Sequence, residues 1–298
     1  MHKQYLYIIT VVLLLFFSVN LRAARLAGSY DGTQCPKLSI GIFENGSYSL
    51  ITSVTLDSEG KFDIQLPDNR KGVLLIACAN GKPAQKALDE ADNTSSLQFL
   101  YDGQDIVYET SWRWHSYYLK IKQGGAPTQL IDRLSELRSD LHEKLEPMGS
   151  LIDNTPAGSE FFATITKEYT RSIRSYNESV KEALSGAPNG SFLKTILTTI
   201  TEPEPPTGLQ GESLIEWLRL HLFDGIDLCA PLTYNSPFFT ERLQRYFYIW
   251  KPEGLALESE FAVLQERGVE LLKTKVAKCG GNIKRLIEIN VKKQMAEN

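Results

Sequence analysis

Four cysteines carry the most distinctive chemistry in this 298-residue chain. They stand far apart, and none forms a Cys-x-x-Cys pair; they are Cys35, Cys78, Cys229 and Cys279. The low-pKa thiolate of a thioredoxin-like redox site normally belongs to such a pair at the start of a helix. We therefore expect no dithiol redox centre. Four buried free thiols are the favoured interpretation, with the disulfides Cys35–Cys78 and Cys229–Cys279 as the alternative.

Histidines and carboxylates suggest one candidate metal site. His221, Asp224 and Asp227 are about one helical turn apart. Zinc sites usually draw ligands from more than one element, so we favour a helix end in which the aspartates accept backbone amides. Paired acids such as Glu202/Glu204 are interpreted as solvent-facing. A hydrolase with two distant acids is the least supported alternative. We expect no metal and no cofactor.

One serine motif matches a known nucleophile pattern. Ser191 and Lys194 have the Ser-x-x-Lys spacing of penicillin-recognising enzymes, which places the lysine one helical turn from the serine. The companion Ser-Asp-Asn and Lys-Thr-Gly motifs do not occur. Because Ser191 follows Gly190, we interpret it as a helix N-cap. No P-loop, Gly-x-Ser-x-Gly or His-Glu-x-x-His motif occurs either, so we expect a protein that is not an enzyme.

Aromatic side chains gather in the predicted strand 112–121, and they are Trp112, Trp114, Tyr117 and Tyr118. They alternate over both faces of that strand. We expect one face to pack against the core, whereas the other could stack on a glycan or contact a protein partner. Packing is the favoured interpretation of the cluster.

The C-terminal residues from Leu271 onward are basic. They include seven basic and two acidic residues, a net charge of +5, whereas the whole chain carries −4. The basic residues are Lys273, Lys275, Lys278, Lys284, Arg285, Lys292 and Lys293. A solvated helix face explains most of this charge. Contact with anionic lipid or with an acidic partner is the alternative.

The first residues read as a targeting signal. Lys3 precedes an apolar run from Tyr5 to Val19, and the small residue Ala23 marks a cleavage point. This order is typical of a secretory signal peptide at residues 1–23, with an uncleaved anchor as the alternative. We therefore expect a periplasmic or envelope protein with no stable membrane span after cleavage. Its mild acidity argues against nucleic acid as a partner.

Two halves with different periodicity follow the signal. Residues 24–125 contain short alternating or β-branched runs separated by turn residues such as Asn45-Gly46 and Gly60, which predict an antiparallel β-sandwich. Residues 126–298 contain apolar residues three or four apart, which predict an all-α helical-hairpin domain. The expected fold class is α+β. The expected helices are Thr128–Pro147, Phe162–Leu184, Phe192–Ile200, Glu212–Leu222, Pro237–Trp250, Leu255–Lys278 and Ile283–Met295.

Several motifs bring a resemblance to a known family. The turn segment 57–62, Asp-Ser-Glu-Gly-Lys-Phe, is similar to a hairpin of the β domain found near the N-terminus of Gram-negative envelope thiol–disulfide oxidoreductases. The segment 217–227 and the Ser-Pro-Phe-Phe sequence at 236–239 resemble the helical domain that follows it there. The residues that match these motifs are His221, Phe223, Asp224, Asp227, Pro237 and Tyr246. Both domains have unknown function in that family.

The departures from that family shape the expected function. The family has an aspartate and an arginine where Cys229-Ala230-Pro231 stands, and its helical domain continues into a thioredoxin module that we expect to be absent here. The resemblance therefore implies no catalytic residue. It implies a non-catalytic accessory protein that docks an envelope partner, such as a separately encoded thioredoxin-like oxidoreductase. A glycan- or ligand-binding envelope protein that uses the strand aromatics is the alternative.

Overall fold

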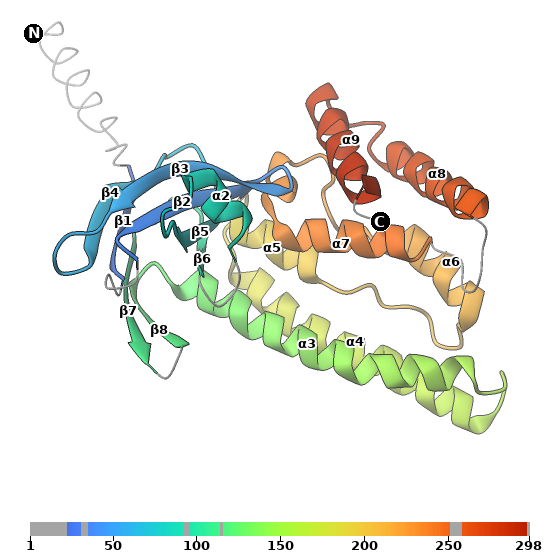
Figure 1. Cartoon of the computed structure of the whole chain (residues 1–298). Coiled ribbons are helices and arrows are strands. Elements are labelled where there is room, and N and C mark those ends of the chain that lie inside the picture. Colours follow the sequence, from blue (N-terminus) through green and yellow to red (C-terminus); the bar gives the residue numbers. More distant parts are fainter. Residues whose placement is uncertain (1–22, 31–34, 92–95, 114–115, 251–257, 297–298) are drawn as a thin grey trace, which may run out of the picture.

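The computed structural model describes residues 23–30, 35–91, 96–113, 116–250 and 258–296. Two four-stranded sheets stand at one end of the described chain, and helices form the rest (Figure 1). The predicted α+β class is therefore confirmed. The predicted signal peptide falls almost entirely on residues 1–22, which lie outside the described residues. Within the described part of the chain, none of the helices has the length and apolar character that crossing a membrane would need.

The strands follow the turn residues and the β-branched runs of the sequence. They are β1 (Arg25–Ser29), β2 (Lys37–Glu44), β3 (Ser47–Thr55), β4 (Lys61–Gln65), β5 (Gly72–Cys78), β6 (Ser96–Tyr101), β7 (Ile106–Arg113) and β8 (Ser116–Gln123). One sheet has the order β4-β1-β7-β8 and the other β3-β2-β5-β6. The β2–β3 turn is built by Asn45 and Gly46, whose φ angles of 54° and 84° lie in the left-handed region that asparagine and glycine tolerate.

Three features of the strand region differ from the sequence prediction. The pair β1–β7 is parallel, whereas the prediction was antiparallel throughout. The helix α2 (Ala84–Asp89) was not predicted. The predicted strand 112–121 is instead the hairpin β7–β8, in which Trp112 pairs with Tyr117. A run of aromatic and β-branched residues has the same local pattern in one strand as in two, so only the pairing shows that two strands are present.

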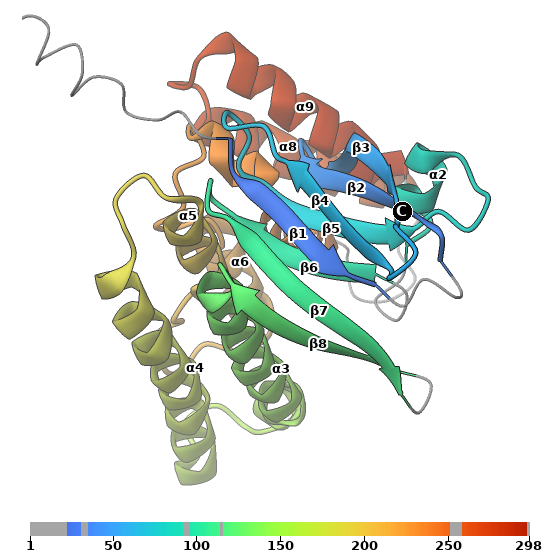
Figure 2. The same cartoon turned by 90° about the vertical axis from the view of Figure 1, so that its left-hand side faces the viewer.

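A shared core joins the two sheets. Buried side chains of both form one apolar cluster, which includes Leu26, Tyr108, Ile40 and Ile76. Figure 2 shows the β4-β1-β7-β8 sheet toward the viewer, with the other sheet behind it. Alternation along each strand sends successive side chains to opposite faces, which lets one face of each sheet supply this cluster.

The helices lie close to the predicted ranges. They are α3 (Ala126–Asp153), α4 (Glu160–Gly186), α5 (Phe192–Ile200), α6 (Gly211–His221), α7 (Pro237–Tyr248), α8 (Glu258–Lys275) and α9 (Gly281–Ala296), with a 3₁₀ helix η1 at Pro231–Asn235. The prediction ended the first helix by Pro147, but α3 continues to Asp153 with Pro147 inside it. Pro147 and Glu143, four residues earlier, are both exposed, so water can bond the carbonyl that proline leaves without a donor.

Side chains on both sides of Gly125 pack together. One apolar cluster combines Phe43, Val73 and Leu100 of the β3-β2-β5-β6 sheet with side chains of α3, α4 and α5, such as Ile131 and Ile196. The helices therefore cover the second face of that sheet. The predicted division into residues 24–125 and 126–298 stays a prediction, although α3 does begin at Ala126.

All four cysteines form disulfides, Cys35–Cys78 and Cys229–Cys279. The favoured expectation of four free thiols was therefore wrong. The Cα atoms are 5.6 Å and 5.1 Å apart, a separation that a disulfide requires. The paired cysteines are separated by 43 and by 50 positions in the sequence, so only the tertiary fold can bring them together.

Candidate functional site

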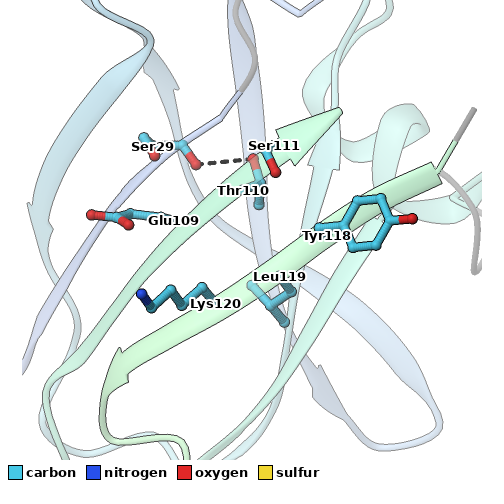
Figure 3. Close-up of a pocket in the computed structure, with 7 residues that line it drawn as sticks. All are labelled: Ser29, Glu109, Thr110, Ser111, Tyr118, Leu119 and Lys120. Atoms are coloured by element: carbon cyan, nitrogen blue, oxygen red, sulfur yellow. Dashed lines mark hydrogen bonds between the residues drawn. The ribbon is translucent and has the colours of Figure 1, made fainter. Parts of the chain in front are cut away.

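A hollow of about 520 Å³ lies along the β7–β8 hairpin (Figure 3). Three strands line it with hydroxyl, charged and apolar side chains, which are Ser29, Glu109, Thr110, Ser111, Tyr118, Leu119 and Lys120. Pairing of β7 with β8 places Glu109 opposite Lys120 and Ser111 opposite Tyr118. The Thr110 hydroxyl donates to the Ser29 carbonyl at 3.0 Å, which joins the hairpin to β1.

The apolar part of this hollow is open to solvent. Tyr118 and Leu119 are 52% and 38% exposed, and as consecutive residues of β8 they point to opposite faces of this edge strand. In the sheet order of the described strands, β8 lies at the edge. Exposed aromatic and aliphatic side chains at a sheet edge are typical of surfaces that contact another molecule.

Charges flank the hollow. Lys122 lies 2.9 Å from Glu109, and this hydrogen bond lowers the pKa of the Glu109 carboxyl and raises that of the Lys122 amine. Both groups are therefore ionised at neutral pH. For polar contacts, the hollow thus offers the Glu109 carboxylate and the Lys120 amine. It also offers four hydroxyl groups, which belong to Ser29, Thr110, Ser111 and Tyr118.

The predicted aromatic cluster is only partly described. Tyr118 lines the hollow, and Trp112 pairs with Tyr117 across the two strands of the hairpin. The expectation that all four aromatics share one strand was therefore wrong. Trp114 and the side chains of Trp112 and Tyr117 lie outside what the structure describes, so their part in a contact stays a prediction.

The candidate metal residues do not form one group. His221 Nδ1 lies 2.6 Å from Asp224 Oδ2, and the His221 ring stacks on Trp217 with centroids 4.5 Å apart. Asp227 Oδ1 instead accepts the amide of Cys229 at 2.9 Å. The favoured interpretation of carboxylates that accept backbone amides is therefore confirmed for Asp227, but it was wrong for Asp224, whose carboxylate bonds the His221 ring instead. Among the described residues, no group of three histidine, cysteine or acidic side chains could hold a metal ion.

The remaining motif residues belong to the helical core. Phe223 is 3% exposed and packs on Tyr246, with ring centroids 5.0 Å apart. Burial raises the pKa of Tyr246 to about 12, and its hydroxyl donates to the Gly268 carbonyl at 2.8 Å. Pro237 is the first residue of α7, where its missing amide hydrogen removes no helix hydrogen bond. These contacts assign Phe223, Pro237 and Tyr246 to packing.

The Ser-x-x-Lys pair forms a helix cap, as predicted. Ser191 Oγ accepts the Lys194 amide at 3.1 Å and so caps α5. The Lys194 amine lies 2.5 Å from the Asn189 side-chain oxygen. The lysine is therefore held by asparagine, while the serine oxygen is engaged by the backbone.

A buried charge cluster around Glu202 is the feature that the sequence prediction missed. The Glu202 side chain is 3% exposed, whereas we expected it to face solvent. Arg138 of α3 donates to it at 2.8 Å, and Arg245 of α7 donates at 2.6 Å. Arg242 Nη2 lies 3.6 Å from it, and His142 Nε2 lies 3.4 Å from it.

The arginines of this cluster also bind neighbouring backbone and side chains. Arg242 is 1% exposed and donates to the carbonyls of Thr201 and Leu222 at 2.7 and 2.9 Å. Arg138 also pairs with Glu241 at 2.9 Å. The cluster therefore ties α3, α7 and the segment after α5 to one another.

The electrostatics hold Glu202 in its ionised form. Burial by itself would raise the pKa of its carboxyl, but the hydrogen bond from His142 and the charges of the three arginines outweigh burial and hold the pKa well below its usual range. Burial lowers the pKa of Arg242 to about 10, which leaves it charged at neutral pH. An ionised carboxylate carries no proton to donate, so Glu202 is not suited to act as a general acid. Its contacts with the arginines instead hold the helices together.

Sequence signals for this cluster were weak. Arg242 and Arg245 are three residues apart and so share a face of α7, and the prolines at 203, 205 and 206 predict an extended segment beside Glu202. Neither pattern indicates which carboxylate meets which arginine.

Comparison with known proteins gave no relatives. Family models, curated proteins and solved structures were each searched with this chain, and none of them matches it. The resemblance to domains of envelope oxidoreductases therefore stays a prediction.

Proposed function

We propose that this chain is a non-catalytic, exported accessory protein that docks a protein partner in the cell envelope. The observation that carries the proposal is the hollow at the β7–β8 edge with its half-exposed Tyr118 and Leu119. Aromatic side chains at such positions contribute much of the binding energy of protein interfaces. The two disulfides agree with an oxidising compartment, and the N-terminal residues 1–23 read as the signal for export.

The partner class follows from the resemblance stated above. Domains of this kind precede a thioredoxin-like module in envelope oxidoreductases, so we propose a separately encoded thioredoxin-like oxidoreductase as the partner. In this proposal the two sheets form a sandwich in which β1–β7 is parallel and the other strand pairs are antiparallel, and the helical-hairpin domain begins at Ala126. The apolar cluster shared by the sheets and the start of α3 support this division.

Site-specific crosslinking tests the docking surface. A photoreactive phenylalanine analogue is placed at Tyr118, and the matched control carries it at Phe161 of α4, which is 56% exposed. In the exporting host, we expect one discrete adduct from position 118, identified by mass spectrometry as a thioredoxin-like protein, and none from position 161. Equal labelling from both positions, or no adduct from 118, would contradict docking at this hollow.

An insulin-reduction assay tests the non-catalytic part. Because both described disulfides lack Cys-x-x-Cys spacing, we expect the purified chain to reduce insulin with dithiothreitol no faster than dithiothreitol alone. Robust turnover that depends on the protein would overturn this part of the proposal.

The composition of the hollow favours glycan binding as a second candidate. Tyr118 lines the hollow together with Ser111, Thr110 and Glu109, and sugar sites combine an apolar ring with a few polar groups. Affinity electrophoresis in gels that contain peptidoglycan fragments tests it. Retention that Tyr118→Ala abolishes and Phe161→Ala preserves would favour this candidate, whereas migration unaffected by the glycan would remove it.

A further inference from the structure

A concentration of positive charge on the C-terminal helices is unexplained by the proposed docking. Between Lys273 and Lys292 the chain has six basic residues and one acidic residue, a net charge of +5 in a chain of net charge −4. Five of the basic side chains are exposed and define what we call the basic corner; they are Lys273, Lys278, Lys284, Arg285 and Lys292. Lys273 pairs with Glu270 at 2.7 Å.

The other four charges of the basic corner form no ion pair among the described residues, and the acidic Glu288, exposed on α9, is the one carboxylate that stands among them in the sequence. Among the residues that the structure describes, no carboxylate lies within ion-pair distance of Lys278, Lys284, Arg285 or Lys292. Lys284, Arg285 and Lys292 outnumber Glu288 along the exposed side of α9, and charges of one sign that gather in this way repel each other unless an anionic surface balances them.

The packing of α9 fixes which way these charges face. Ile283, Ile287 and Val291, each four residues apart, are buried in the apolar cluster that α7 and α8 also supply. Lys284, Arg285 and Lys292 are therefore turned away from that cluster. Figure 1 shows α9 on the outer edge of the helical part, far from the long α3–α4 pair. The disulfide of Cys279, between α8 and α9, ties this end of the chain to Cys229.

Apolar side chains lie beside the charges. Ile289 of α9 is 46% exposed between Arg285 and Lys292 in the sequence. Leu220 is 52% exposed, and its carbonyl accepts the Lys275 amine at 2.7 Å. Basic side chains together with exposed aliphatic ones are the pattern of helices that lie on lipid headgroups, where the aliphatic groups enter the acyl boundary.

We propose that the basic corner binds the surface of an anionic phospholipid bilayer. Lys278, Lys284, Arg285 and Lys292 contact lipid phosphates, while Ile289 enters the headgroup region. A flat bilayer presents many anionic groups at once to an exposed helix face, which suits four basic residues without ion pairs that are spread along α9 and its preceding turn. This contact leaves the β7–β8 hollow, on a different part of the chain, for the proposed protein partner.

Vesicle sedimentation tests the proposal. The full chain is mixed with vesicles of phosphatidylglycerol and phosphatidylcholine, or of phosphatidylcholine alone. The partition coefficient is measured for each vesicle type, and the two values are compared. Because the apolar N-terminal run is present in every sample, its contribution cancels in comparisons between variants. We expect binding to the anionic vesicles that falls steeply with salt. Neutralising two residues, Lys284→Gln with Arg285→Gln, weakens it about 25-fold, since each charge contributes about a factor of five.

A matched charge change elsewhere is the control. Lys167→Gln with Arg171→Gln removes the same charge from the exposed face of α4 and should leave the partition within about twofold. In the variant Ile289→Trp, the tryptophan emission should shift to the blue, relative to the unmodified chain, on anionic vesicles only. Equal partition onto both vesicle types, or equal losses in both double variants, would overturn the proposal. So would binding to soluble polyglutamate without binding to vesicles, which would assign the basic corner to an acidic protein.

Discussion

Replacing Glu202 with glutamine is expected to lower the free energy of unfolding by about 3–5 kcal/mol. The variant keeps the size of the side chain but removes the charge that Arg138, Arg242 and Arg245 surround. Two of these arginines are almost fully buried, so the variant leaves them with an uncompensated charge in a region of low dielectric. Urea unfolding followed by circular dichroism measures the difference.

Glu204→Gln is the matched control, two residues away in the same extended segment. Its carboxylate is 35% exposed and pairs with Arg174 at 3.3 Å, so the expected loss is below about 1 kcal/mol. Equal losses for the two variants would show that the cluster around Glu202 contributes no more than a surface pair.

The Glu202 contribution should depend on pH. The pKa of this carboxyl is lower in the folded protein than in the unfolded chain, so the folded state binds fewer protons. The stabilisation is therefore complete above the ordinary glutamate value of 4.5 and is lost as pH falls below it, through the folded pKa. We expect the stability gap between the wild type and Glu202→Gln to narrow below that pH. A gap that stays constant between pH 7 and pH 3 would contradict this linkage.

Removing the Cys229–Cys279 disulfide is expected to cost about 4 kcal/mol, in the variant Cys229→Ala with Cys279→Ala. The disulfide closes a loop of 50 residues, which restricts the unfolded chain. It also holds the α8–α9 turn against the segment before η1, so local opening should increase there. Urea unfolding measures the global loss, and amide hydrogen exchange in α8 and α9 measures the local one.

The second disulfide supplies the comparison. Cys35→Ala with Cys78→Ala removes a loop of similar size, 43 residues, within the strand region. The loss in the free energy of unfolding should be similar. Faster amide hydrogen exchange, however, should appear in β2 and β5 and not in α8 and α9. Alkylation of the unreduced, unfolded protein at four thiols would show that neither disulfide forms and would contradict both expectations.

Local patterns in the sequence determined the elements of this protein. Strand and helix periodicity, the Asn45-Gly46 turn and the cap at Ser191 all depend on residues within about four positions of one another. The physical causes of these elements, namely backbone sterics, side-chain periodicity and capping of free amides, act over that same short range. The class of the fold could therefore be predicted from the sequence.

Tertiary structure alone decided the remaining features. Arg138 and Glu202 meet across 64 residues, and β1 pairs in parallel with β7 across about 80 positions of the chain. The burial of Glu202 and the pairing of the cysteines each depend on such distant contacts. Local sequence does not encode which distant groups become neighbours, because that outcome is set by packing of the whole core.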